Sequence, residues 1–169
     1  NVDGILNTNG EETVTGLTAT GTINGEGTVS ALTTDLTDAT VNANLGGDSL
    51  TSNGETNLNG NAAAGNVTVA GGTLTVDGAL TNNAATVNVV DGTLAANGTI
   101  AASSINVNEN ATLTTGEAER LNNGVALNAD GTVSLGGNET IGDLSGSGTV
   151  ANNGNDLTVN QTSDQEFSG

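Results

Sequence analysis

The sequence contains no cysteine, histidine, proline, methionine, tryptophan or tyrosine, and its only aromatic residue is Phe167. Without cysteine the chain has neither a disulfide framework nor a thiolate metal site. Without histidine it lacks the side chain most often used as a general base at neutral pH and as a zinc ligand. A core anchored by large aromatic side chains is therefore excluded, together with the commonest catalytic and metal-binding arrangements.

Basic side chains are almost absent as well. Arg120 stands against 19 Asp and Glu residues, which gives a formal net charge of −18 at pH 7. Such a chain cannot bind nucleic acid by neutralising phosphates, nor hold anionic lipid with a basic patch. No apolar run approaches the length of a spanning helix, so we expect no membrane insertion. The acidic surface favours an extracellular protein, and the missing initial Met predicts a mature or excised segment of a longer precursor.

The apolar residues of the chain are almost all aliphatic. Leu, Ile, Val and Phe together number 37 of the 169 residues, beside 20 Ala. This composition lies just above the range in which disorder is expected. This apolar content is low for a spherical core but sufficient for the core of a narrow rod.

A short motif, Gly-Thr followed by Leu, Ile or Val, recurs along the chain. It occurs seven times, more often than the composition alone predicts, and it ends at Ile23, Val29, Leu74, Leu94, Ile100, Val133 and Val150. Glycine permits the backbone angles of a turn, and Thr then begins a strand whose next side chain points inward. Asn-Gly occurs seven times and Asp-Gly four times, as further turn signals that tolerate positive φ.

The segments between these turns alternate polar and apolar residues over three to five positions, which predicts short half-buried strands. Their aliphatic residues fall into three columns with a period of roughly 20 residues. The columns are Val67, Val87, Ile105 and Val125; Leu74, Leu94, Leu113 and Val133; and Leu36, Leu58, Leu80, Ile100, Leu121 and Ile141.

This period predicts an all-β protein, a parallel β-helix or β-solenoid of about eight coils of roughly 20 residues. We expect one domain over residues 1–169, with irregular coils in 1–60 and regular coils in 61–169. The competing architecture is a β-sandwich, which usually needs a larger repeating unit and a large buried aromatic residue. The solenoid is the favoured interpretation.

The C-terminal third resembles a known family. Residues 116–150, GEAERLNNGVALNADGTVSLGGNETIGDLSGSGTV, followed by GNDLTV and by FSG (167–169), resemble the autotransporter-associated β-strand repeat of bacterial surface proteins. The telling features are ETIGDLSGSGTV and Phe167, which matches the usual aromatic of that repeat. The resemblance implies a right-handed parallel β-helix on or outside a bacterial cell, secreted without disulfides and without enzymatic activity.

Three carboxylates in Asp-Gly turns, Asp77, Asp91 and Asp130, are candidates for a calcium site if stacked turns gather them into a ladder. Asp-Gly is also the commonest dipeptide for such turns, and neither a calcium-binding nonapeptide nor an EF-hand pattern is present. We therefore favour a turn role and expect neither a metal site nor a cofactor.

The segment GEAERL has the only helical tendency in the chain. Glu117, Glu119 and Arg120 predict a surface ion pair on a short excursion from the rod. Paired carboxylates also occur in glycoside hydrolases, but this chain lacks the aromatic or basic groups that would hold a sugar. We expect no enzyme.

Two functions remain open. The first is an extracellular structural subunit of a bacterial surface that stacks head to tail into a filament or stalk, because the ends of a solenoid expose unpaired backbone groups and apolar faces. The candidate stacking residues are Val2, Ile5 and Leu6 at one end and Phe167 at the other. The alternative is a passenger segment of an autotransporter-type adhesin that binds a cell-surface or glycan ligand through its lateral face.

Overall fold

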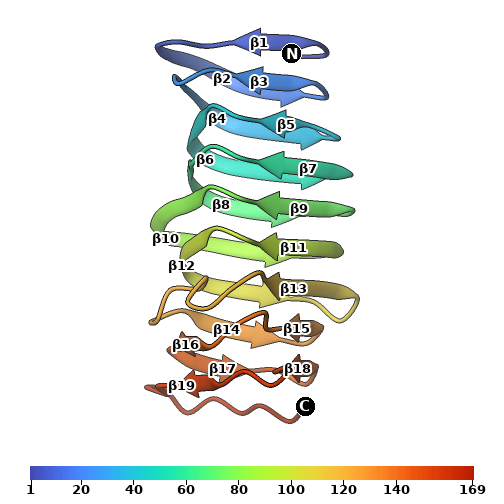
Figure 1. Ribbon diagram of the computed structural model, residues 1–169, viewed down its shortest axis with the longest axis vertical. Helices are drawn as coiled ribbons and strands as arrows, with labels where there is room; N and C mark the ends of the chain where they lie inside the picture. Colours follow the sequence, from blue (N-terminus) through green and yellow to red (C-terminus); the bar gives the residue numbers. More distant parts are fainter.

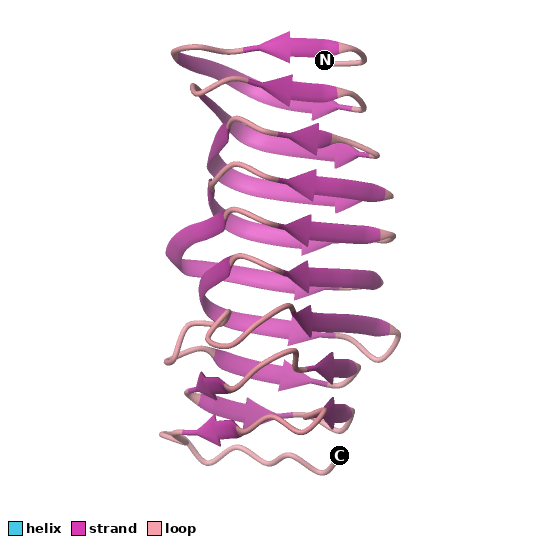
Figure 2. Cartoon of the chain, viewed as in Figure 1, coloured by secondary structure: helices cyan, strands magenta, loops and turns pink.

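The chain folds into a β-solenoid, a stack of parallel coils (Figure 1). The computed structural model describes the backbone of residues 1–169 and every side chain except those of residues 83 and 84. Successive coils lie directly on one another, with the two termini at opposite ends of the rod. Strands and connecting loops account for the whole picture in Figure 2, and the described residues include no helix that could cross a membrane.

One wall of the rod is a nine-stranded parallel sheet, which we call the narrow sheet because its strands are short. Its strands, in order, are β1 (Ile5–Asn7), β3 (Thr22–Asn24), β5 (Thr40–Val41), β7 (Glu55–Leu58), β9 (Thr73–Val76), β11 (Gly92–Ala96), β13 (Ala111–Thr115), β15 (Thr132–Ser134) and β18 (Thr149–Ala151).

The opposite wall is an eight-stranded parallel sheet, which we call the wide sheet. Its strands are β2 (Glu11–Ala19), β4 (Thr28–Thr37), β6 (Asn44–Asn53), β8 (Ala62–Val69), β10 (Ala79–Val89), β12 (Thr99–Val107), β14 (Ala126–Ala129) and β17 (Asp143–Ser145). A third, two-stranded sheet of β16 (Glu139–Ile141) and β19 (Leu157–Val159) joins them near the C-terminus.

The predicted all-β parallel solenoid is confirmed, with about nine turns of about 18 residues rather than eight longer ones. The difference arises from short turns near the N-terminus. Thr28 pairs with Asn44 in the next coil, whereas Thr73 pairs with the more distant Thr93, so the N-terminal coil is the shorter of the two. The coils of residues 1–60 use the same parallel pairing as the coils that follow them.

The predicted columns are right in part. The column of Leu74, Leu94, Leu113 and Val133 is confirmed. Val67, Val87 and Ile105 also stack, but the next residue is Leu127 and not Val125.

The third column is wrong at its start. Leu80, Ile100 and Leu121 pair as expected. Leu58, however, lies in the narrow sheet between Val41 and Val76, and Leu36 pairs with Ser52. The two walls carry similar alternating patterns, so spacing alone cannot assign an aliphatic residue to one wall when the coil length varies.

The core is the row of inward side chains between the walls. Aliphatic residues and Ala from every part of the rod are less than about one-tenth exposed, and the largest include Ile23, Leu50, Leu74, Ile105 and Leu113. Each coil is too small to bury these side chains alone, so burial depends on the coil above and the coil below. Only the first and last coils lack one of these neighbours.

Candidate functional site

The N-terminal end of the rod is an open edge of both sheets. β1 is the outermost strand of the narrow sheet and β2 the outermost strand of the wide sheet, at the top of Figure 1. β1 pairs with β3 alone, and β2 pairs with β4 along its length and on its other side only at Ala19, which Val2 bridges. The other side presents backbone N–H and C=O groups that can pair with a further strand.

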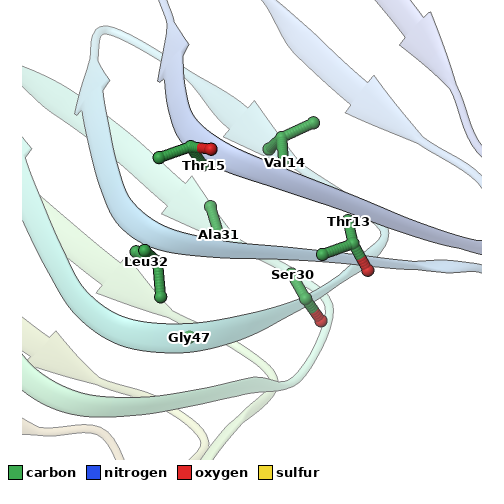
Figure 3. Close-up of a pocket in the computed structure, with 7 residues that line it drawn as sticks. All are labelled: Thr13, Val14, Thr15, Ser30, Ala31, Leu32 and Gly47. Atoms are coloured by element: carbon green, nitrogen blue, oxygen red, sulfur yellow. The ribbon is translucent and has the colours of Figure 1, made fainter.

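A groove lies beside this edge, where β2, β4 and β6 bend (Figure 3). It has a volume of about 630 Å³ and its lining is mostly apolar. The lining residues are Thr13, Val14, Thr15, Ser30, Ala31, Leu32 and Gly47. Val14, Ala31 and Gly47 stack in register on consecutive strands, and a Cβ on Gly47 would lie 1.7 Å from the Ala31 carbonyl oxygen.

Exposed aliphatic side chains concentrate at this end. Among the described residues, four large hydrophobic side chains are exposed, and three of them, Ile5, Val14 and Leu32, lie in the first two coils. Val14 is 42% exposed although it shares a register column with Ala31, which is 3% exposed. β2 lies over Ala31, whereas no residue pairs with the outer side of β2 at Val14. A further coil placed here would bury the side chain of Val14.

The three predicted N-terminal stacking residues occupy different positions. Val2 forms a parallel bridge with buried Ala19, and Leu6 pairs with Ile23, so both are partly buried and pack against the core. Ile5 alternates with Leu6 on β1 and is 71% exposed, so it faces outward from the narrow sheet. Val2 and Leu6 are thus in the line of the core at the open end, whereas Ile5 lies on the lateral face.

The C-terminal end is covered by a segment without regular strands, residues 161–168, which we call the C-terminal strap. Phe167 pairs with Gly146, and Ser168 N–H donates to the Gly146 carbonyl at 2.9 Å. Phe167 is partly buried against the core, with Leu157 and Val159 of β19. The last coil therefore also carries apolar side chains that no further coil covers.

Asp143 holds the strap in place. Its Oδ1 accepts hydrogen bonds from Thr162 N–H at 2.7 Å and from Ser163 N–H at 3.2 Å, and its Oδ2 accepts one from Ser163 Oγ at 2.8 Å. These bonds, the one from Thr162 N–H first, lower the pKa of Asp143. The side chain thus replaces the backbone ladder that would otherwise join the strap to β17.

Both ends are acidic. Asp3, Glu11 and Glu12 are exposed at the N-terminal end. Asp164 and Glu166 are exposed on the strap. Contact between the two ends would bring like charges together, and such repulsion weakens as salt screens the exposed charges.

A buried carboxylate occurs in the coil next to last. Glu139 is 1% exposed, and its Oε1 and Oε2 accept hydrogen bonds from Arg120 N–H at 2.9 Å and Leu121 N–H at 3.1 Å. Burial raises the pKa of Glu139, while these two backbone bonds oppose that shift and the nearby Glu119 adds to it. The side chain ties the 116–123 excursion to β16, so its role is to position a loop.

Sequence reasoning did not identify Glu139, although a signal exists. In the strand E-T-I, Glu139 and Ile141 share the same face, and Ile141 is an obvious inward residue. An acidic residue in phase with inward aliphatics indicates a buried carboxylate. Val14, Leu32 and Asp143 were missed for a different reason, because their roles depend on which strand lies at an edge.

The three turn aspartates serve local hydrogen bonds. Asp77 accepts from Asn97 Nδ2 at 2.8 Å, Asp91 from its neighbour Gly92 N–H at 2.7 Å, and Asp130 from Ser147 N–H at 3.2 Å. Within the described part of the chain, no three acidic residues lie close enough to hold a metal ion. The structure therefore does not bring Asp77, Asp91 and Asp130 together as a calcium ladder.

The GEAERL segment forms bends and a turn instead of a helix. Arg120 Nη2 donates to Glu117 Oε2 at 2.5 Å, which is the predicted surface ion pair. Glu119 Oε1 accepts from Thr140 Oγ1 at 3.1 Å, so Glu117 and Glu119 have separate partners. They do not face each other across a common substrate cleft.

No protein-family model, curated protein or solved structure matches the chain. The β-solenoid is established by the structure alone.

Proposed function

We propose that the protein is an extracellular structural element, a solenoid segment that stacks head to tail with another solenoid end into a filament or stalk. The observation that carries the proposal is the open N-terminal edge, where no strand pairs with the outer sides of β1 and β2 and Val14 is left 42% exposed in the line of the core. A strand added to such an edge gains backbone hydrogen bonds and buries apolar surface at the same time.

The C-terminal end supplies the complementary surface. β18 is the last strand of the narrow sheet and its outer edge is unpaired by any named strand. Contact of this end with the N-terminal end of a second copy is heterologous, so each addition leaves a new open end and growth continues. Val14, Val2 and Leu6 at the N-terminal end and the partly buried Leu157, Val159 and Phe167 at the other would be covered in the same step.

The acidic ends set the conditions for assembly. At low ionic strength, the like charges of Asp3, Glu11 and Glu12 oppose those of Asp164 and Glu166. At physiological salt the screening length is about 8 Å, and at 1 M it falls to about 3 Å. We therefore expect assembly to increase with salt and with protein concentration.

Electron microscopy combined with sedimentation velocity, across protein concentration and salt, tests the proposal. The expected result is unbranched fibres with a subunit repeat near 40 Å, from about nine coils at roughly 4.8 Å each, growing longer as salt increases. Discrete short rods at every concentration, in high salt as well as in low salt, would contradict it.

The alternative function, a passenger segment of an autotransporter-type adhesin on a bacterial surface, is supported by the resemblance of residues 116–169 to the autotransporter-associated repeat. In that case the ends continue into further coils and the lateral face binds a surface or glycan ligand. Retention of the protein on a glycan array or on intact cells, with no end-to-end assembly, would favour this second function.

A further inference from the structure

The outward face of the narrow sheet carries a regular two-file array of Thr and other small uncharged residues. Consecutive strands from β9 to β18 place these residues in register, one above another. The first file is Thr73, Thr93, Thr112, Thr132 and Thr149, and the second file is Thr75, Ala95, Thr114, Ser134 and Ala151. We call this surface the Thr face.

The Thr side chains of this face lie on the solvent side of the sheet, because they alternate with buried residues such as Leu74, Leu94 and Leu113. All seven Thr residues are partly or fully exposed, and none of their hydroxyls has a hydrogen-bond partner within the described protein. Only Ser134 Oγ is engaged, by Asn153 Nδ2 at 2.9 Å. On the wide sheet, in contrast, some outward side chains bond to each other, as Ser104 does to Thr86 at 3.2 Å and Asn106 to Asn88 at 2.9 Å.

The Thr face also carries no charged side chain. None of its ten positions is acidic, although the chain has 19 Asp and Glu residues and a net charge of −18. Acidic residues occur at its borders: Glu55 pairs with Thr73 at the N-terminal limit, and Asp77 and Asp91 lie in the flanking turns. An uncharged surface on so acidic a protein is poorly suited to a cationic ligand or a basic partner.

The spacing of the array is fixed by the backbone. Adjacent strands place Thr residues about 4.8 Å apart along each file, and alternate residues of a strand place the two files roughly 6.6 Å apart. Thr is β-branched and stiff about χ1, so hydroxyls and methyls are held at repeating positions without much loss of side-chain entropy. Figure 1 shows β9, β11 and β13 stacked with little rotation between them, which keeps the first three rows of the array close to one plane.

We propose that the Thr face binds ice. The five unpaired hydroxyls of the first file, about 4.8 Å apart, together with those of Thr75 and Thr114 in the second file, can hold a first layer of water as a template for ice. The hydroxyls hydrogen-bond the water and the intervening methyls exclude disordered water, so that the ordered layer merges with a crystal surface. Charged side chains would disrupt this layer, and the Thr face has none.

Soluble sugars fit the Thr face less well. Glycan sites usually combine apolar platforms with a few converging polar groups in a concave pocket. The Thr face has no aromatic residue, and its first file repeats Thr along the rod. One side chain repeated over five coils suits a crystalline partner, which repeats in the same way.

Ice binding is measured by thermal hysteresis and by partition of the protein into a slowly growing ice hemisphere. The 169-residue chain is expected to give a measurable freezing-point hysteresis, faceted ice crystals and enrichment in the ice fraction. The double variant Thr93→Lys with Thr112→Lys, on adjacent coils of the first file, is expected to reduce all three to the level of a non-binding protein.

A matched control lies on the opposite wall. Thr51 and Thr68 are also partly exposed neighbours in register on adjacent coils, but they face outward from the wide sheet. Thr51→Lys with Thr68→Lys should leave the ice activity unchanged, with circular dichroism and thermal melting confirming that both double variants fold. Absence of hysteresis in the folded native chain would overturn the proposal, and so would equal loss of activity in the two double variants. Binding to crystalline polysaccharide or face-to-face dimerisation, without adsorption to ice, would also overturn it.

Discussion

Ser52 is a polar residue in a column of aliphatic side chains. It is fully buried between Leu36 and Val69, its partners in register on the neighbouring coils, and its Oγ has no hydrogen-bond partner. A buried hydroxyl without a partner costs free energy, because its bonds to water are lost and not replaced.

Ser52→Ala is therefore expected to increase the free energy of unfolding by about 1 kcal/mol. The change removes the unpaired hydroxyl and leaves the size of the site almost unchanged. Urea denaturation of both proteins measures the difference. A decrease of similar size would mean that the hydroxyl is satisfied by a buried water, and that the stated cost is wrong.

The glycines of three Asn-Gly and Asp-Gly turns serve a purpose that the sequence did not reveal. Gly60, Gly78 and Gly98 follow Asn59, Asp77 and Asn97, and none of the three has a positive φ. A Cβ on Gly78 would lie 2.2 Å from the carbonyl oxygen of Gly60, and one on Gly98 would lie 1.6 Å from that of Gly78. These turns need glycine because adjacent coils approach closely, and not because the backbone is left-handed.

Gly78→Ala is expected to lower the free energy of unfolding by about 1–3 kcal/mol, the usual range for overpacking. Gly124→Ala is the matched control, since a Cβ there meets no atom within 4 Å. Chemical denaturation of the two variants gives the comparison. Equal effects would show that loss of backbone freedom, and not contact between coils, decides the outcome.

At the scale of elements, Glu139 couples β16 to the loop that precedes it. Burial raises its folded-state pKa above the ordinary value, so the folded protein binds a proton more readily than the unfolded chain. The free energy of unfolding from this group therefore increases as the pH falls through the folded pKa toward the unfolded value near 4.5.

Glu139→Gln should flatten the pH dependence of stability between neutral pH and about pH 4.5, because the titrating group is removed. Glu139→Ala should instead destabilise the protein by about 2–5 kcal/mol, since Arg120 N–H and Leu121 N–H lose their acceptors. Urea unfolding as a function of pH measures both effects. An unchanged pH profile in Glu139→Gln would show that another group titrates in this range.

The pKa of Asp143 is shifted in the opposite direction, so its effect on stability falls in a different pH range. Its pKa is lowered by the hydrogen bonds from the strap, so its contribution is present above the unfolded value near 3.8 and is lost as the pH falls through the folded pKa. The strap is thus expected to loosen in acid, whereas the contribution of Glu139 to stability increases as the pH falls toward 4.5, because its buried charge is neutralised.

Asp143→Asn is expected to speed amide hydrogen exchange at Thr162 and Ser163 severalfold at neutral pH, because both N–H groups donate to the carboxylate. Asp164→Asn, in the same strap, changes the charge equally and serves as the control. If the control accelerates exchange as much, the cause is the charge of the strap and not the hydrogen bonds of Asp143.

At the scale of the whole molecule, end-to-end assembly depends on the surface left open by the first coil. Val14 and Val90 are exposed to a similar degree, 42% and 46%, but Val14 lies on the outermost strand and Val90 lies beside the middle of the rod. Val14→Asp is expected to raise the protein concentration at which fibres form by at least about tenfold. This change corresponds to a loss of roughly 1.4 kcal/mol in the free energy of each end-to-end contact. Val90→Asp should leave that concentration unchanged, as measured by sedimentation velocity.

Loss of assembly in both valine variants would show that added negative charge, at any position, prevents association. Assembly unaffected in both would show that the N-terminal edge is not the contact surface. Because the Thr face lies on a side wall, neither outcome changes the expectation for ice binding.

The sequence by itself determined the class of the fold. Glycine turns, strict alternation over short segments and a regular repeat of inward aliphatic residues permit little else for a chain with almost no aromatic residue. It also determined what the surface is made of, as the column of Leu74, Leu94, Leu113 and Val133 shows: once these residues point inward, the Thr residues beside them point outward.

Only the tertiary structure decided which residues become neighbours. Coil length varies along the rod, so Leu58 and Leu36 fall on different walls although their spacing suggested one column. The tertiary structure also decides the candidate sites. The strap bound by Asp143 and the two Thr files are formed by residues about one coil apart, and the open edge at Val14 depends on which strand has no neighbouring coil. Their register follows from the lengths of the intervening turns, which depend on how closely the coils can pack.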